Sequence, residues 1–288
     1  MSIEDVTVGS CVLVATLIFV PIYVKILYHF IRPPKYRSLE CYQLMFQQGI
    51  AQCCHAFYYI PYALFLIFEF EFYGFLGVGV RLMGGMIRVE TSLGLVLALN
   101  RLKIICELRY PKFYHKLLCV LSWLFGFAYI GAFFTPYAGL NFEVKEKGSV
   151  FDYSKPLTAV VQEIGYIVLF AVSVITLIIY LFLVIYLMVK KCRFKHVVID
   201  FKERWILMQA VLRFIGDDTL TFMYHLLPHL ATITAKYIPY YRLGMSVGYV
   251  VNNLVLPTML YILLNRSLRQ EMLVPKRTIT VVLQAPSK

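Results

Sequence analysis

The sequence predicts an all-α membrane protein whose fold is a seven-transmembrane helix bundle. Of the 288 residues, 60% are hydrophobic and only 15% are charged, and the mean hydropathy is +0.72, which excludes an ordinary water-soluble domain. A helix needs about 20 mostly apolar residues to cross the hydrocarbon core of a bilayer. Seven stretches satisfy this requirement, at about 10–30, 42–68, 82–100, 117–136, 164–189, 205–230 and 243–264.

The whole chain, 1–288, is predicted to form a single domain. The seven stretches occupy most of it and leave only short loops and a short tail, 265–288, so a soluble catalytic or ligand-binding domain has no room. No internal repeat relates the two halves, and no Gly/Ser-rich linker separates them. Any activity is therefore expected within the helix bundle.

The first stretch, 10–30, is expected to be retained as a transmembrane helix. The residues before it include Glu4 and Asp5 but no Lys or Arg, whereas a cleavable signal peptide begins with a basic region. The second, fourth and fifth stretches qualify as spans by their apolar length alone.

Ionisable side chains interrupt the third and sixth stretches. Arg88 and Glu90 lie in the third, and Arg213, Asp217 and Asp218 lie well inside the sixth. A charge at the centre of a bilayer costs about 2.5 to 3.5 kcal/mol, so these groups should face the bundle interior and pair with one another. Arg213 and Asp217 are four residues apart and can pair within one helix, whereas Arg88 and Glu90, two residues apart, point in different directions.

The depth of these charges predicts a contact between the third and sixth helices. At about 1.5 Å per residue, Arg88, Asp217 and Asp218 all lie roughly 20 Å from the inner ends of their helices. We therefore expect Arg88 to pair with Asp217 or Asp218. The functional interpretation is a ligand pocket or a lock between the two helices, and the alternative is a purely structural ion pair.

A proline interrupts the seventh stretch. Pro257 removes a backbone hydrogen bond and is expected to kink the helix, and Tyr261, four residues later, faces the same side. Together they could supply a hinge and a polar group that moves, although membrane helices also tolerate proline without a functional purpose. Asn265 and Arg269 mark the return to water, and the segment 265–273 can form an amphipathic helix on the bilayer surface.

The distribution of basic residues predicts that the N-terminus lies outside and the C-terminus in the cytoplasm. In this orientation 19 of the 28 Lys and Arg residues fall on the inner side, and only six fall outside: Arg81, Lys145, Lys147, Lys155, Lys236 and Arg242. Basic residues tend to stay on the cytoplasmic side during insertion. The formal net charge of +12 is therefore mainly a topology signal, and no nucleic-acid partner is needed to explain it.

Short motifs occur in the second, third and last stretches: Cys41-Tyr42-Gln43-Leu44-Met45 with Gly49-Ile50, then Leu97-Ala98-Leu99-Asn100-Arg101, then an ending with Tyr261, Asn265 and Arg269. Over roughly 40–270, the chain resembles the nematode serpentine chemoreceptors, which are seven-transmembrane G-protein-coupled receptors, with the Srt-type group as the nearest match. The resemblance implies a chemosensory receptor that binds a small chemical cue within the bundle and activates a heterotrimeric G protein. It also implies a location in the plasma membrane or the sensory cilium.

The resemblance assigns G-protein coupling and switching to six residues: Asn100, Arg101, Pro257, Tyr261, Asn265 and Arg269. The guanidinium of Arg101 could meet the C-terminal peptide of a Gα subunit or the carbonyls of an inner loop. The alternative is that Arg101 extends to the interface with water and only sets the topology.

The chain also departs from the pattern of rhodopsin-like receptors. Gln52 stands where an acid is usual, so a sodium ion would lack a carboxylate ligand there. Asn100 replaces the acid that usually precedes Arg101, and Leu256 replaces the usual asparagine before Pro257. No cysteine lies near the outer end of the third stretch, so the customary disulfide cannot form, and the seven cysteines are interpreted as reduced thiols.

A small multi-span transporter or channel that uses the buried charges as an ion path is the alternative function. Transporters often show internal pseudosymmetry and paired broken helices, and neither is evident in this sequence. An enzyme is not expected, because no zinc motif or Ser/His dyad occurs at matching depth. The expected partners are a small-molecule ligand, a heterotrimeric G protein and the lipid bilayer, with no cofactor, metal or nucleic acid.

Overall fold

The computed structural model describes residues 2–71, 74–193, 201–231, 238–264 and 269. The helices are α1 Ile3–Ile31, α2 Pro34–Arg37, α3 Glu40–Cys54, α4 Ala56–Phe68, α5 Phe75–Ile105, α6 Phe113–Phe134, α7 Thr158–Arg193, α8 Phe201–Ala231, α9 Ile238–Val250, the π-helix η2 Val251–Val255 and α10 Leu256–Leu264. Two short strands, β1 Leu140–Glu143 and β2 Gly148–Phe151, lie between α6 and α7.

These elements confirm the predicted bundle of seven helical rods. The second rod consists of α3 and α4, and the seventh consists of α9, η2 and α10. Within the described residues, six rods are long and apolar enough to cross a membrane. The remaining rod, α8, is 31 residues long and carries Arg213, Asp217 and Asp218 near its middle. Its charges therefore need partners inside the bundle.

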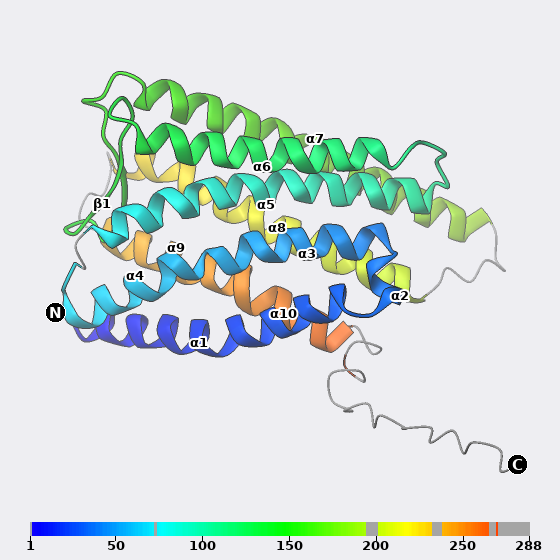
Figure 1. Ribbon diagram of the computed structural model, residues 1–288, viewed down its shortest axis with the longest axis horizontal. Coiled ribbons are helices and arrows are strands. Elements are labelled where there is room, and N and C mark those ends of the chain that lie inside the picture. The colour runs from blue at the N-terminus through cyan, green and yellow to red at the C-terminus, as the bar shows by residue number, and fades with distance from the viewer. Residues whose placement is uncertain (1, 72–73, 194–200, 232–237, 265–268, 270–288) are drawn as a thin grey trace, which may run out of the picture.

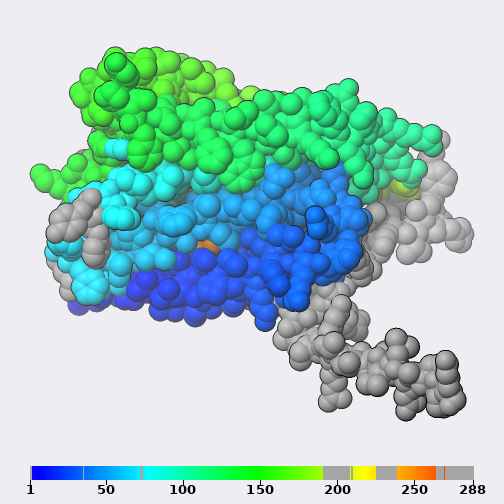
Figure 2. Space-filling model, in the orientation of Figure 1, coloured from blue at the N-terminus to red at the C-terminus, as the bar shows by residue number. Residues whose placement is uncertain are grey.

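The rods lie side by side along the long axis of the molecule (Figure 1). The N-terminus and the β-strands lie at one end, called here the hairpin end, and α2 lies at the opposite end, called the α2 end. The central rod is α5, which packs against α3, α4, α6, α7 and α8. Figure 2 shows one face as successive bands, with α1 along one edge, α3, α4 and α5 in the middle, and α6 and α7 along the other edge.

The outward faces of the peripheral rods are apolar. Leu17 on α1, Leu124 on α6 and Ile178 on α7 are each more than half exposed. Such surfaces suit lipid, in which apolar side chains need no water and polar groups must find partners within the protein. The bundle therefore places its polar residues in the interior.

An antiparallel hairpin formed by β1 and β2, which the sequence does not predict, closes the hairpin end. Its register pairs Leu140 with Phe151. Arg81 on α5 donates from Nε to the Leu140 carbonyl oxygen at 2.9 Å. Lys147, in the turn of the hairpin, forms an ion pair with Asp5 at the start of α1, with an Nζ–Oδ1 distance of 2.6 Å. The hairpin is thus attached to both α5 and α1.

Two facing glycines bring α5 and α6 close together. A Cβ atom added to Gly85 would lie 2.8 Å from the Gly126 carbonyl oxygen, and one added to Gly126 would lie 2.9 Å from the Gly85 carbonyl oxygen. Small residues permit such close approach of helices in membranes. One turn further along each helix, the contact places Arg88 of α5 over the ring of Tyr129 of α6.

Candidate functional site

A π-helical turn in the seventh rod carries two buried asparagines. Pro257 has no N–H, and in a regular α-helix its ring would clash with the carbonyl of Asn253, four residues earlier. The chain before Pro257 forms the wider π-helix η2, which contains Asn252 and Asn253. Both side chains are buried. The irregular turn thus offers two amides to the interior at one level.

A single irregular residue divides the second rod. His55 lies between α3 and α4, and its backbone N–H donates to the carbonyl of Gln52, three residues back, as in a 3₁₀ turn. The His55 side chain is fully buried. The amide Nδ2 of Asn253 donates to His55 Nδ1 at 2.9 Å and to the Tyr59 hydroxyl oxygen at 3.3 Å. These bonds join the second rod to the seventh.

The centre of the bundle holds an ion pair between Glu90 on α5 and Arg213 on α8. Arg213 Nη2 donates to Glu90 Oε1, and both side chains are more than nine-tenths buried. Gln52 Nε2 donates to the same carboxylate oxygen at 2.7 Å, and the Tyr23 hydroxyl donates to Gln52 Oε1. Removal of either charge would leave the other in a site away from water, which is costly.

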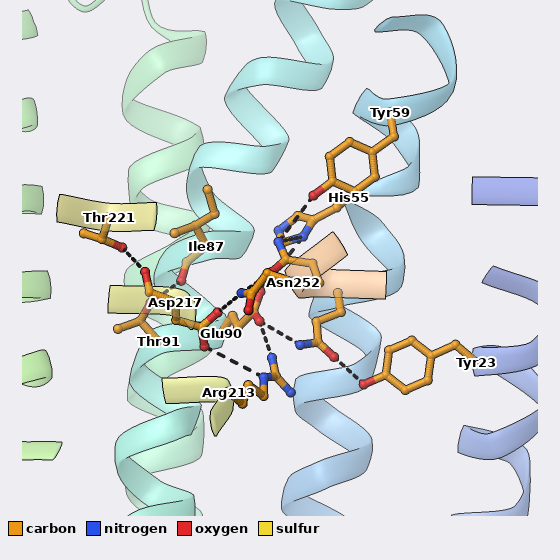
Figure 3. Close-up of polar contacts among 12 residues, drawn as sticks. Tyr23, His55, Tyr59, Ile87, Glu90, Thr91, Arg213, Asp217, Thr221 and Asn252 are labelled. Atoms are coloured by element: carbon orange, nitrogen blue, oxygen red, sulfur yellow. Dashed lines mark hydrogen bonds and ion pairs between the residues drawn. The ribbon is translucent and has the colours of Figure 1, made fainter. Parts of the chain in front are cut away.

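Asp217 extends this cluster to the seventh rod. Arg213 Nε lies 3.8 Å from Asp217 Oδ2, which is the ion pair within one helix that the sequence predicts. Asn252 Nδ2 donates to Asp217 Oδ1. The whole set is here called the central network: Tyr23, Gln52, His55, Tyr59, Glu90, Arg213, Asp217, Asn252 and Asn253 (Figure 3). It connects α1, α3, α4, α5, α8 and η2.

The expected pairing of Arg88 with Asp217 or Asp218 is wrong. Arg88 forms no ion pair within the described residues, and the helix-to-helix pair is made by Glu90 and Arg213. The depth of a residue fixes its position along the helix axis but not its direction, and Glu90, unlike Arg88, faces Arg213 of α8. Asp218 hydrogen-bonds Ser173 on α7 and takes no part in the central network.

Arg88 instead lines a cavity of about 380 Å³ near the hairpin end. Residues of α4, α5, α6, α7, α8 and α9 form its walls, and the hairpin contributes Gly148, Ser149, Val150 and Phe151. Most of its lining is apolar or aromatic, with a few polar groups among them. Cavities of this size and composition are typical of small-molecule binding sites.

The cavity and the central network are adjacent. Thr221 lines the cavity and donates to the backbone carbonyl of Asp217, one turn away, at 2.8 Å. Tyr249 lines the cavity and lies one turn before Asn252. Ile87 of α5 also lines the cavity and lies three residues before Glu90, and Figure 3 shows both residues beside the network. A molecule in the cavity would therefore contact α5, α8 and α9 beside the network.

Arg101 lies near the α2 end of α5 and is buried, with 5% of its surface exposed. Its Nη2 donates to the Cys41 thiol at the start of α3, and its Nε has no hydrogen-bond partner in the described part of the protein. Asn100 is also buried, and its Oδ1 is similarly unpaired. In this conformation the Arg101 side chain therefore does not extend into water.

The predicted switch residues of the last rod are distributed differently. Tyr261 is buried, and its ring centroid lies 6.0 Å from that of Tyr23 on α1 and 5.3 Å from that of Phe30. Arg269 Nη1 donates to the Leu263 carbonyl at 3.5 Å. Asn265 lies outside the described residues. Tyr261 thus contacts a member of the central network.

Several members of the central network are not predicted from the sequence. His55, Asn252 and Asn253 have no place in the expected site, and the sequence marks Gln52 only as a poor sodium ligand. The available signal was the presence of polar side chains in apolar stretches, which is uncommon in transmembrane helices and indicates interior positions. Their partners depend on the turns at His55 and η2.

No protein-family model matches the sequence, and no curated protein matches it. Among solved structures, 161 chains match the fold. One of them is the crystal structure of squid rhodopsin, with a TM-score of 0.66 and 12% sequence identity, and the match covers 93% of this chain and 83% of that one. The chain therefore has a rhodopsin-like fold of seven helical rods, typical of a multi-pass membrane protein.

Proposed function

We propose that this chain is a G-protein-coupled receptor that binds a small-molecule cue in the cavity at the hairpin end. One observation carries the proposal: the cavity adjoins a buried polar network that links five of the seven rods. A polar network inside a bundle can adopt two discrete sets of contacts, and a ligand that binds one conformation better shifts the protein toward it. The rhodopsin-like fold supports this reading.

The described conformation corresponds in this proposal to the resting receptor. Arg101 of α5 is buried at the end of the bundle where Tyr180 and Leu183 of α7 and Ala210 of α8 form a buried cluster with α5, and it contacts Cys41 of α3. A Gα peptide cannot reach a buried guanidinium. Activation would therefore require α8 to move outward at the α2 end, which breaks contacts of Arg213 and exposes Arg101.

The orientation and the cue belong to the same proposal. The hairpin end, with the N-terminus, faces the outside, and the α2 end faces the cytoplasm, as the basic residues indicate. The sequence motifs favour a chemosensory role of the nematode serpentine kind, in the plasma membrane or a sensory cilium. The G protein would be heterotrimeric.

The transporter or channel alternative gains little from the buried charges. Glu90 and Asp217 both contact Arg213, so the described acids of the network neutralise a cation of the protein itself. In an ion path, charged side chains would have to leave their protein partners in order to bind the passing ion. A cation or anion flux in liposomes without a G protein would nevertheless favour this alternative.

The proposal is tested with Arg101→Ala. We expect this variant to reach the cell surface but to lose cue-driven nucleotide exchange on Gα, because the guanidinium is the group that opening of the bundle would present. Arg109→Ala, which removes an exposed arginine on the same side, is the matched control and should signal normally. Full signalling by Arg101→Ala would contradict the proposed role.

A further inference from the structure

The cavity at the hairpin end contains an arginine that no acid neutralises among the residues that the structure describes. Arg88 is 7% exposed, and its guanidinium carbon lies 3.2 Å from the centroid of the Tyr129 ring. Its Nη1 donates to the Gly84 carbonyl at 2.8 Å, but its Nε has no hydrogen-bond partner within the described residues. A buried charge without a counter-ion is costly, so this arginine needs a functional or structural reason.

The second arginine of the cavity is neutralised by the protein. Arg242 Nη2 lies 2.6 Å from Glu146 Oε2, and Arg242 Nη1 donates to the Ser149 carbonyl at 2.9 Å. Glu146 is the only carboxylate among the described residues that line the cavity. The lining therefore carries one uncompensated positive charge, and that charge belongs to Arg88.

The surroundings hold the Arg88 guanidinium in one place. Tyr129 covers one face, and Gly165 on α7 leaves room beside it: a Cβ atom added to Gly165 would lie 2.7 Å from Arg88 Nη2 and 2.9 Å from Nε. A fixed planar guanidinium suits planar oxyanions, which accept two parallel hydrogen bonds from it. The other walls include Val80, Met83, Ile87 and Leu169, which suit an apolar body.

We infer that the cavity binds a small organic anion, namely a monocarboxylate with an apolar body whose carboxylate pairs with Arg88. The identification of this anion as the cue rests on the proposed receptor function. Binding of the anion to the cavity does not, because binding needs no G protein. The inference assigns the chemical class of the cue: the carboxylate supplies the missing counter-ion and the apolar part fills the aromatic walls. Neutral and cationic analogues of the same shape lack the counter-ion.

The test measures thermal unfolding of the purified full-length protein with three carboxylates, benzoate, phenylacetate and hexanoate, each compared with its matched alcohol and amine. At least one carboxylate should raise the melting temperature saturably, because a ligand that binds only the folded state stabilises it. Its matched alcohol and amine should raise it less. If no carboxylate exceeds its matched alcohol and amine, the inference is overturned.

Variants locate the anion. Arg88→Gln should weaken binding of the stabilising carboxylate by at least about tenfold, because the carboxylate loses its charged hydrogen-bond donor. If Arg88→Gln cannot be purified folded, Gly165→Ala serves instead, because its added methyl group crowds the guanidinium; Gly131→Ala, whose Cβ would meet nothing within 4 Å, is its control. Unchanged affinity in the purified variant, or loss only in Arg242→Gln, overturns the assignment to Arg88.

The same titration separates this inference from the proposed function. A carboxylate that stabilises the protein through Arg88 but never drives nucleotide exchange supports the site and contradicts the receptor. Exchange driven by a neutral or cationic cue, with no carboxylate binding, supports the receptor and contradicts the site.

Discussion

The ion pair between Glu90 and Arg213 is predicted to hold the proposed receptor in its resting state, and the two single variants should differ in how much they destabilise the protein. In Glu90→Gln, Arg213 keeps Asp217 as a partner, with Nε 3.8 Å from Oδ2. In Arg213→Gln, both acids lose their cation at once. Removing one partner of a buried pair costs about 3 to 5 kcal/mol. We therefore expect Arg213→Gln to lower the free energy of unfolding by an amount within or above this range. Glu90→Gln should lower it by less.

Part of this energy should appear as basal activity. If about 2 kcal/mol of the pair energy distinguishes the resting state from the active one, its loss shifts their ratio roughly 30-fold, since about 1.4 kcal/mol is a factor of ten. A receptor that is active in about 1 of 100 molecules would then be active in roughly one of four. The change is large enough to measure without any ligand.

The assay is ligand-free nucleotide exchange on Gα, normalised to the amount of receptor at the cell surface. Each variant changes the free-energy difference between the resting and active states, which the basal exchange reports. In the double variant Glu90→Gln with Arg213→Gln, this change should differ from the sum of the two single changes by about 1 to 3 kcal/mol, as it does for contacting residues. Asp218→Asn, next to the network but outside it, is the matched control. Basal exchange at the wild-type level in both single variants would refute the proposal that the Glu90–Arg213 ion pair acts as a lock. Simple addition of the two single effects in the double variant would refute it as well.

Two further predictions concern topology and packing. An epitope at the N-terminus should stain intact cells and one at the C-terminus should require permeabilisation, because basic residues favour the cytoplasmic side; the reverse staining would contradict the receptor proposal. Gly85→Ala should destabilise the purified protein by about 1 to 3 kcal/mol, because the new Cβ would lie 2.8 Å from the Gly126 carbonyl oxygen. Gly77→Ala, whose Cβ would meet nothing within 4 Å, should leave the melting temperature nearly unchanged, and an equal loss in both would show that the glycine contact is not responsible.

The rods could be predicted from the sequence because each must satisfy one simple condition, a long apolar run that crosses the bilayer. Among the described rods, α8 is less apolar than the other six because of Arg213, Asp217 and Asp218, yet the length of its apolar run still predicts it. The hairpin was not found, because its strands contain only four residues each and lie in a segment between rods. Contacts such as the 2.9 Å hydrogen bond from Arg81 to Leu140 fix it, and such contacts join positions distant in sequence.

The sequence predicts which charged residues belong to the candidate site, but it does not predict which residues of other helices they contact. Buried Arg213 and Asp217, four residues apart, follow from helical geometry alone, and the structure confirms their contact. To predict that Glu90 is the partner of Arg213 on α5, one must know how α5 is rotated about its own axis. The depth of a residue in the membrane does not give this rotation. Asn253 required the π-helical turn, and a proline four residues later allows that turn without specifying it.

The separation of Arg88 and Glu90 by two residues on α5 leads to a last prediction. Arg88 faces the cavity and Glu90 pairs with Arg213, so a single helix would connect the proposed ligand site to the proposed lock. If a carboxylate on Arg88 favours the unlocked state, breaking the lock must in turn strengthen binding of the carboxylate, because coupling between two sites is reciprocal. Glu90→Gln should therefore bind the stabilising carboxylate more tightly, by a factor that does not exceed the one by which saturating carboxylate increases the ratio of active to resting receptor, because only part of the variant population is unlocked. Thermal titration of the purified variant measures the first factor, and nucleotide exchange by the wild type measures the second. Equal affinity in the variant and the wild type, alongside a ligand response in the wild type, would show that the cue acts by a route that does not include this lock.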